Sequence, residues 1–254
     1  MSIHTTPRLY NADSLSQGAS IELGDEQAHY LLHVMRQKDG DIIRLFNAKD
    51  GEWQGVFGKS GKRGVIIRLE KQRREPKPER DLWLCPSPIK KAHFDYMIEK
   101  ATELGVSRIQ PILTARTQLR EVNGERCRAI ATESAEQSER LSVPDIAAPQ
   151  TLTALLAEWP KDRLLIVCAE WGEADTIRAS LARQTTTEST KAAILTGPEG
   201  GLTAEELDAI RRLPQALFVR LGQRILRADT AAIAALSVWQ AICGDWTSSK
   251  SPDN

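Results

Sequence analysis

The stretch LTGPEGGLTAEEL, at 195–207, joins a short apolar run to the start of a helix through a glycine-rich turn. Thr203 followed by Glu206 is the pattern of a capping box, which fixes the helix start and leaves the glycines just outside it. Glycine turns between a strand and a helix commonly bind phosphate groups. A phosphate site is therefore the first hypothesis to test.

The turn lacks what a phosphate site needs. A P-loop reads G-x-x-x-x-G-K-[ST], yet no lysine follows Gly200 and Gly201, and the dinucleotide fingerprint G-x-G-x-x-G is absent as well. Pro198 removes one backbone N–H donor, and Glu199 adds a negative charge where a phosphate would lie. The glycines instead let the backbone approach a flat ligand, neutral or cationic, and read its edge with amide and carbonyl groups.

A second loop of the same kind, LGQRILRADT at 221–230, follows another apolar run and is dense in charged side chains. One interpretation is that such a loop is only a tight connection and binds no ligand. The presence of two such loops makes this interpretation the less favoured one. Both loops lie where short apolar strands alternate with helices, a rhythm typical of a parallel sheet with helices on both faces. In such sheets ligands bind at the carboxyl ends of the strands.

The apolar periodicity predicts the elements of this α/β region. Gly105 is expected to end a helix, and Pro111 is expected to lie at a strand end or sheet edge. The predicted strands span 81–85, 106–113, 163–170, 191–197 and 216–222, and the predicted helices span about 90–104, 124–140, 151–159 and 173–183.

The first seventy residues have a different pattern. Strands at 41–47 and 64–70, glycine-rich turns and one short helix around 26–36 favour a small β-barrel. The segment RREPKPER at 73–80 has two prolines and no apolar residue to bury, so it is predicted to be a linker. The expected domains are thus a barrel at 1–72 and an α/β domain at 81–246, with a flexible tail at 247–254.

Charge is balanced overall but not along the chain. The 254 residues carry 34 basic and 34 acidic side chains. Residues 59–74, however, hold seven basic residues and one acid, Glu70. Such a cluster fits either a nucleic-acid backbone or a strand edge kept soluble by its charge. No apolar run approaches the roughly 18 residues of a membrane span, and the start has no signal-peptide pattern, so a cytoplasmic protein is expected.

The sequence predicts no metal site. The four cysteines lie far apart, which indicates reduced thiols, and His29 and His33 have no nearby third ligand.

The two glycine loops together resemble the signature loops of the SPOUT methyltransferases. More narrowly they resemble the family that methylates N3 of a uridine in small-subunit (16S) ribosomal RNA. Further matches cover nearly the whole chain in order: PRLY at 7–10, HYLLHVMRQKDGD at 29–41, EKATELGVSRIQPILTART at 99–117 and AEQSER at 135–140. One departure is Arg227-Ala228-Asp229-Thr230-Ala231, where many members read R-T-E-T-A.

The resemblance implies a PUA-like, RNA-binding β-barrel followed by a SPOUT α/β domain with a C-terminal trefoil knot. It also implies S-adenosylmethionine as methyl donor, small-subunit 16S rRNA as partner, and a homodimer. The segment at 221–236 would form the knot. Residues expected to bind the donor, mostly through backbone groups, are Leu195, Thr196, Gly197, Gly201, Leu221, Gly222, Ile225 and Leu226.

The implied chemistry assigns roles to charged residues. N3 of uracil carries a proton, and its loss leaves negative charge on O2 and O4, which an arginine can stabilise. Arg227 is the expected stabiliser and Arg224 the alternative, although either could instead contact RNA phosphate. Glu199 or Asp229 is expected to accept the proton or to orient a reacting group. The residues expected to dock RNA are Arg8, Arg36, Lys62 and Arg63.

Two other functions remain open from the sequence. One is a SPOUT enzyme that acts on another RNA position, such as a ribose 2′-hydroxyl. The other is a non-catalytic RNA-binding factor for ribosome assembly. That second alternative would be favoured if the loops had lost their glycines or Arg227, and both are retained.

Overall fold

The structure, a computed structural model, describes residues 6–61, 64–168, 174–184 and 190–247. It divides into two compact units, one formed by residues up to 78 together with 135–143, the other by 79–134 and 144–254. Residues 135–143 thus lie in the first unit, although the sequence places them in the α/β domain. The predicted tail at 247–254 lies, except for Thr247, outside the described residues.

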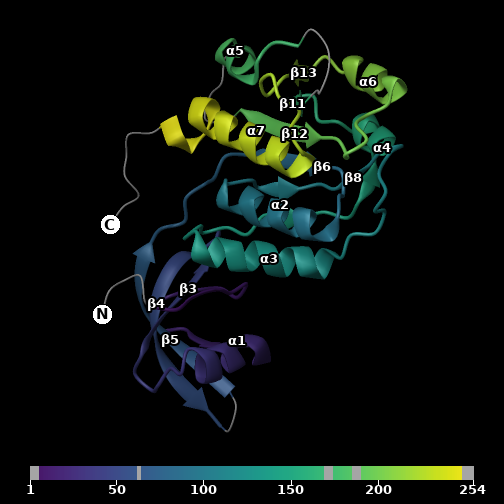
Figure 1. The fold of residues 1–254 in the computed structure, drawn as a ribbon. Coiled ribbons are helices and arrows are strands. Elements are labelled where there is room, and N and C mark those ends of the chain that lie inside the picture. Colours follow the sequence, from purple (N-terminus) through teal and green to yellow (C-terminus); the bar gives the residue numbers. More distant parts are fainter. Residues whose placement is uncertain (1–5, 62–63, 169–173, 185–189, 248–254) are drawn as a thin grey trace. The chain divides into compact units, whose positions relative to one another are not determined.

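The first unit is built on a five-stranded mixed sheet (Figure 1). Its strand order is β1-β3-β4-β5-β2, with β1 parallel to β3 and the other pairs antiparallel. Helix α1 (Asp25–His29) continues as a π-helical turn (Tyr30–Val34), which together match the predicted short helix. The strands are β1 (Arg8–Tyr10), β2 (Ser20–Glu22), β3 (Ile42–Asn47), β4 (Gly51–Ser60) and β5 (Gly64–Arg74).

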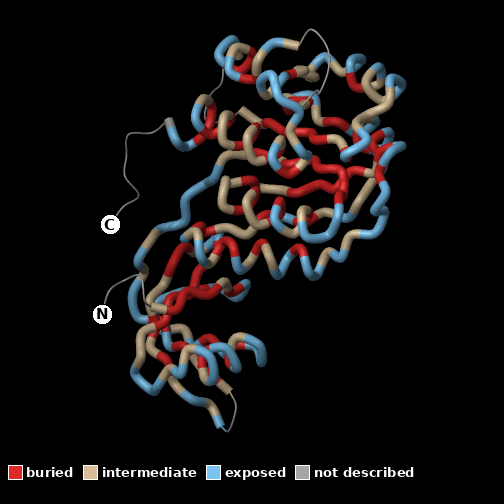
Figure 2. The backbone as a smooth tube through the Cα atoms, viewed as in Figure 1, coloured by how far each residue is buried: buried red, intermediate tan, exposed pale blue. Residues whose placement is uncertain are grey.

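Alternating apolar residues build the core of this sheet (Figure 2). In β5, Val65, Ile67 and Leu69 are at most 1% exposed, while the residues between them turn outward. Strand side chains alternate between the two faces of a sheet, so this pattern puts one face on the core. Arg68, which lies between Ile67 and Leu69, is exposed and belongs to the outer face.

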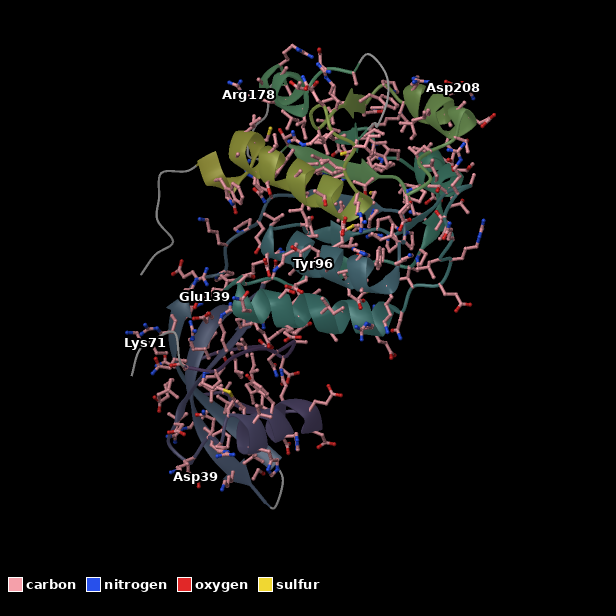
Figure 3. All side chains as sticks on the ribbon, viewed as in Figure 1. Asp39, Lys71, Tyr96, Glu139, Arg178 and Asp208 are labelled. Atoms are coloured by element: carbon pink, nitrogen blue, oxygen red, sulfur yellow. The ribbon has the colours of Figure 1, made fainter. Side chains whose placement is uncertain are left out.

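A buried arginine links β1 to residues 135–143. The Arg8 guanidinium lies 3.5 Å from the centre of the Phe46 ring and donates to Glu52 Oε2 at 2.6 Å. It also donates to the carbonyl oxygens of Ala135, at 2.9 Å, and Arg140. Glu139, labelled in Figure 3, adds an ion pair to Arg44 at 3.3 Å. The PRLY and AEQSER motifs therefore meet in one structural cluster.

The second unit is a six-stranded parallel sheet of order β13-β11-β12-β6-β7-β9. Strand β12 comes late in the sequence, but in the sheet it lies between β11 and β6. The predicted trefoil knot stays a prediction. The strands are β6 (Leu82–Pro86), β7 (Arg108–Ile109), β9 (Asp145–Ile146), β11 (Arg163–Cys168), β12 (Lys191–Thr196) and β13 (Ala216–Val219).

Pro111 divides the predicted strand at 106–113. Its first part is β7, and its second part, β8 (Ile112–Leu113), pairs with β10 (Gln150–Thr151) in a separate two-stranded sheet. Proline has no N–H to donate to a ladder, so the chain changes sheets there.

Helices cover the parallel sheet, and α7 packs against α2, α5 and strands β6 and β12 (Figure 1). Helix α2 has Met97, Ile98 and Ala101 fully buried, and Gly105, the predicted helix end, follows it at φ 80°. No helix of the described residues is long and apolar enough to cross a bilayer. The helices are α2 (Lys91–Glu103), α3 (Gly124–Gln137), α4 (Leu152–Ala157), α5 (Ile177–Ala182), α6 (Ala204–Arg211) and α7 (Ala228–Cys243), followed by a 3-10 turn (Asp245–Thr247).

Replacing Arg8 by alanine should lower the free energy of unfolding by about 3–5 kcal/mol, because it removes the nearest partner of the buried Glu52 carboxylate. Urea denaturation followed by circular dichroism measures this change. Arg68→Ala is the matched control. Within the described part of the chain Arg68 forms an exposed ion pair with Glu70 at 3.8 Å, so its loss should cost less than about 1 kcal/mol. Equal costs for the two variants would contradict a stabilising role for the buried cluster.

Candidate active site

The two glycine loops emerge at one edge of the parallel sheet. Residues 197–203 follow β12 and residues 220–227 follow β13, and both strands pair in parallel with β11. Their carboxyl ends therefore point the same way, toward the edge where α/β sheets bind ligands. Two neighbouring hollows lie there.

The larger hollow is a cavity of about 730 Å³, which is within the usual size range of small-molecule sites. Three of the four predicted catalytic residues line it: Glu199 from the first loop, and Arg227 and Asp229 around the start of α7. The other lining residues are Ile89, Lys90, His93, Gln118, Ile225, Leu226 and Ala228.

The smaller hollow, of about 60 Å³, is lined by most of the residues predicted to bind the donor. The fourth predicted catalytic residue, Arg224, lines this hollow and not the larger cavity. Leu195 and Gly201 line neither: Leu195 is fully buried in the core. The lining residues are Cys168, Thr196, Gly197, Arg220, Leu221, Gly222, Arg224, Ile225, Leu226, Ala228 and Ala231.

The first loop has the turn geometry that its glycines predict. Gly201 has φ 69°, a value that favours glycine, and its N–H donates to the Pro198 carbonyl at 2.8 Å. The capping box is present, because the Thr203 hydroxyl accepts from Glu206 N at 3.3 Å and Glu206 Oε2 accepts from Thr203 N at 2.9 Å. Arg116 Nη1 donates to the Gly200 carbonyl at 2.6 Å, which ties the turn to a segment far away in sequence.

Several features of the smaller hollow fit a ligand with polar edges and an apolar face. The Thr196 hydroxyl is buried and has no hydrogen-bond partner in the described residues, a state that a ligand atom would relieve. Gly222 has φ 114°, and no atom lies within 4 Å of the position its Cβ would take. Ile225 is 67% exposed at the rim, where it can cover a ring.

Three charged side chains at the site have no polar partner within the part of the chain that the structure describes. Among the described residues, Glu199, Arg224 and Arg227 form no hydrogen bond or ion pair through their side chains, and all three are exposed. Arg227 is the N-cap residue of α7, with φ −64° and ψ 155°. Its charge stands beside the N-terminus of that helix, where backbone N–H groups already favour an anion.

Asp229 has a different environment, which the sequence did not reveal. It is 8% exposed, and its Oδ2 lies 2.8 Å from His93 Nδ1 of α2. Its Oδ1 accepts from Thr230 N at 2.8 Å. Burial alone would raise the pKa of Asp229, but the hydrogen bonds from His93 and from the Thr230 backbone outweigh burial and keep the pKa below its ordinary value. Asp229 is therefore an ionised, fully engaged carboxylate.

The residues predicted to dock RNA have separate placements. Arg8 is 7% exposed, and its guanidinium is occupied by the buried cluster, so we withdraw it from the RNA-contacting set. Arg36 is exposed and has φ 54°, which is rare outside glycine. Lys62 and Arg63 lie outside the described residues.

Comparison with known proteins agrees with this geometry. Residues 75–240 match the RNA methyltransferase domain family, and residues 23–70 match the RNA methyltransferase PUA domain family. The ribosomal RNA small subunit methyltransferase E of Rickettsia conorii is 35% identical over 231 residues, which cover 91% of this chain and 93% of that protein. The protein of the same name from Synechocystis is 33% identical, with 88% and 74% covered.

Solved structures are similar over nearly their whole length. A ribosomal RNA small subunit methyltransferase E from Neisseria gonorrhoeae, bound to S-adenosyl methionine, has a TM-score of 0.84 and 26% identity, covering 95% of this chain and 99% of its own. A putative methyltransferase of Legionella pneumophila, in complex with the cofactor SAM, has a TM-score of 0.82 and 27% identity, covering 94% and 99%. The predicted PUA-like and SPOUT domains are thereby confirmed. The chain belongs to the RNA methyltransferase family, among the ribosomal RNA small subunit methyltransferase E proteins.

Proposed function

We propose that this protein transfers a methyl group from S-adenosylmethionine to N3 of a uridine in 16S rRNA. The observation that carries the proposal is the shared wall between two hollows: Ile225, Leu226 and Ala228 line both of them. Methyl transfer needs such an arrangement, in which a donor and an acceptor are held side by side with their reacting atoms in line. The relatives with this fold that bind S-adenosyl methionine support the choice of donor.

The smaller hollow and its rim would hold the donor. The Thr196 hydroxyl and the backbone around Gly197, Leu221 and Gly222 would bind its polar edge, while Ile225 and Leu226 would cover its apolar face. We include Leu195 and Gly201 only as backbone that shapes the turn. When bound, the donor supplies a methyl group attached to a positively charged sulfur.

The larger cavity would hold the target base. A uridine within folded RNA must leave its stack to present N3, which costs a few kcal/mol. Arg227 would stabilise the negative charge that develops on O2 or O4, and Glu199 faces the same space and can orient the base. Arg224 lines the donor hollow, so we assign it to that side.

RNA docking is proposed for the first unit, in line with the predicted RNA-binding domain at 1–72. Exposed basic residues follow one another along β5, and Arg36 is exposed on the loop after the π-helical turn. Repeated phosphate contacts of this kind would offset the cost of unstacking the target base. We propose that the protein acts in the cytoplasm as a homodimer, as the family resemblance implies.

The proposed function is tested by deleting the gene and analysing 16S rRNA by mass spectrometry. We expect one base-methylated uridine to disappear and to return with the wild-type gene. Digestion to nucleosides separates N3-methyluridine from a 2′-O-methyl nucleoside. Unchanged rRNA methylation after deletion would overturn the proposal, and loss of a ribose methyl would support the alternative target.

Gly222→Val should abolish donor binding, because a branched side chain would fill the hollow and strain a backbone at φ 114°. Isothermal titration calorimetry with S-adenosylmethionine measures the effect. Gly40→Val is the matched control: Gly40 also has positive φ, 93°, and open space around its Cβ, but it lies in the first unit. Donor binding that survives in the Gly222 variant would refute this placement.

Arg227→Ala should lower the methylation rate roughly 10²–10³-fold while leaving the donor Kd unchanged, because Arg227 faces the base cavity. Arg224→Ala should instead weaken donor binding. Single-turnover rates on transcribed rRNA and calorimetry separate the two effects, and the exposed Arg212 supplies the control variant Arg212→Ala. The reverse pattern, with donor affinity falling in Arg227→Ala, would exchange the two roles.

A further inference from the structure

Two titratable side chains, Lys90 and His93, line the base cavity from outside the two glycine loops. His93 projects from the first turn of α2, 136 residues before Asp229, and its Nδ1 lies 2.8 Å from Asp229 Oδ2. The two partners differ in burial: the Asp229 side chain is 11% exposed, whereas the His93 side chain is 43% exposed. The carboxylate thus lies behind the imidazole, and the imidazole faces the space where the base would bind.

The hydrogen bond determines which nitrogen of His93 is available. Asp229 is ionised and can only accept, so Nδ1 must carry the proton and donate it. In the neutral ring the lone pair then resides on Nε2. No hydrogen-bond partner of Nε2 is present among the described residues. A carboxylate that fixes a histidine tautomer in this way also stabilises the imidazolium that forms when Nε2 takes up a proton.

We propose that His93 is the catalytic base that removes the N3 proton of the target uridine, and that Asp229 is its positioning residue. This inference rests on the proposed function. It replaces the expectation that Asp229 or Glu199 accepts the proton: Asp229 is already engaged by two donors, and Glu199 is an exposed loop carboxylate that no described partner holds in place.

The step balances without any further reactant. The N3–H bond of uracil breaks, its proton moves to His93 Nε2, and the electron pair stays on the ring, spread over N3, O2 and O4. N3 then uses this pair to form the bond to the donor methyl, whose bond to sulfur breaks with its electrons remaining on sulfur. The imidazolium afterwards releases its proton to water through the open side of the cavity.

The surrounding charges are compatible with this step. Lys90 from the start of α2 and Arg227 from the start of α7 line the cavity and would stabilise the deprotonated base. Glu199 from the β12–α6 loop and Asp229 from α7 are the acidic groups that line it. These four are the charged groups that line the same cavity as His93.

The test measures single-turnover methylation of transcribed rRNA by His93→Gln and His93→Arg, with saturating RNA and donor, across pH 5 to 9. We expect the rate of each variant to fall about 10²–10⁴-fold and its pH–rate profile to differ from that of the wild type. The donor affinity measured by calorimetry should stay unchanged. His33→Gln, a substitution of an exposed histidine in the first unit, is the matched control.

His93→Arg distinguishes a base from a structural cation. Arginine can keep the ion pair with Asp229 but cannot accept a proton near neutral pH. Wild-type activity in this variant would overturn the proposal. The N3 proton of 5-fluorouridine is more acidic than that of uridine. On RNA that contains 5-fluorouridine, His93→Gln should therefore lower the methylation rate much less than on unmodified RNA. An equal drop in rate on the two RNAs would also contradict the proposal. A wild-type enzyme that leaves N3 unmethylated would instead refute the proposed function itself.

Discussion

The burial of β12 between β11 and β6 is the constraint on which the site depends. Its residues Ala192 to Thr196 are at most 2% exposed, and every one of them pairs with β6, while most also pair with β11. A strand paired on both sides is held by two hydrogen-bond ladders, because a slip would break its pairing with β6 and with β11 together. The glycine turn that leaves its carboxyl end is therefore held in place, and the second loop reaches the same edge through the pairing of β13 with β11.

The two hollows at that edge use different parts of the chain. The smaller one is lined by glycine-turn backbone, by apolar side chains such as Leu221 and Leu226, and by the polar side chains of Thr196, Arg220 and Arg224. The larger one has an apolar wall, and its charged side chains come from the start of α2, from the first loop and from the start of α7. Under the proposed function, donor binding and reaction chemistry would fall to different hollows, so substitutions on the two sides should have different kinetic signatures. Helix α7 packs on α2, and this packing brings Asp229 of α7 to His93 of α2.

The buried Arg8 cluster shows how a motif can be structural although its residue type suggests RNA binding. Arg8 contacts Phe46, Glu52 and the carbonyl groups of residues 135–143, so it stabilises the first unit from inside. A fragment that ended at residue 72 would lack residues 135–143, so Phe46 would lose its packing against Ala135 and Leu141. RNA contact by this unit is thus assigned to exposed residues of its surface, such as Arg36 and the outer positions of β5.

The sequence by itself determined what depends on neighbouring residues. Apolar periodicity and glycine positions predicted the strands, the capping box at Thr203 and the two ligand loops, because each is a local property of the backbone. Only the tertiary structure decided what depends on distant pairing. It paired His93 with Asp229 across 136 residues, buried Arg8 beside Glu52 across 44, and drew residues 135–143 into the first unit. An ionisable side chain looks the same in sequence whether it meets water, RNA or a buried counter-charge, and its role is set by the partner that the fold brings to it.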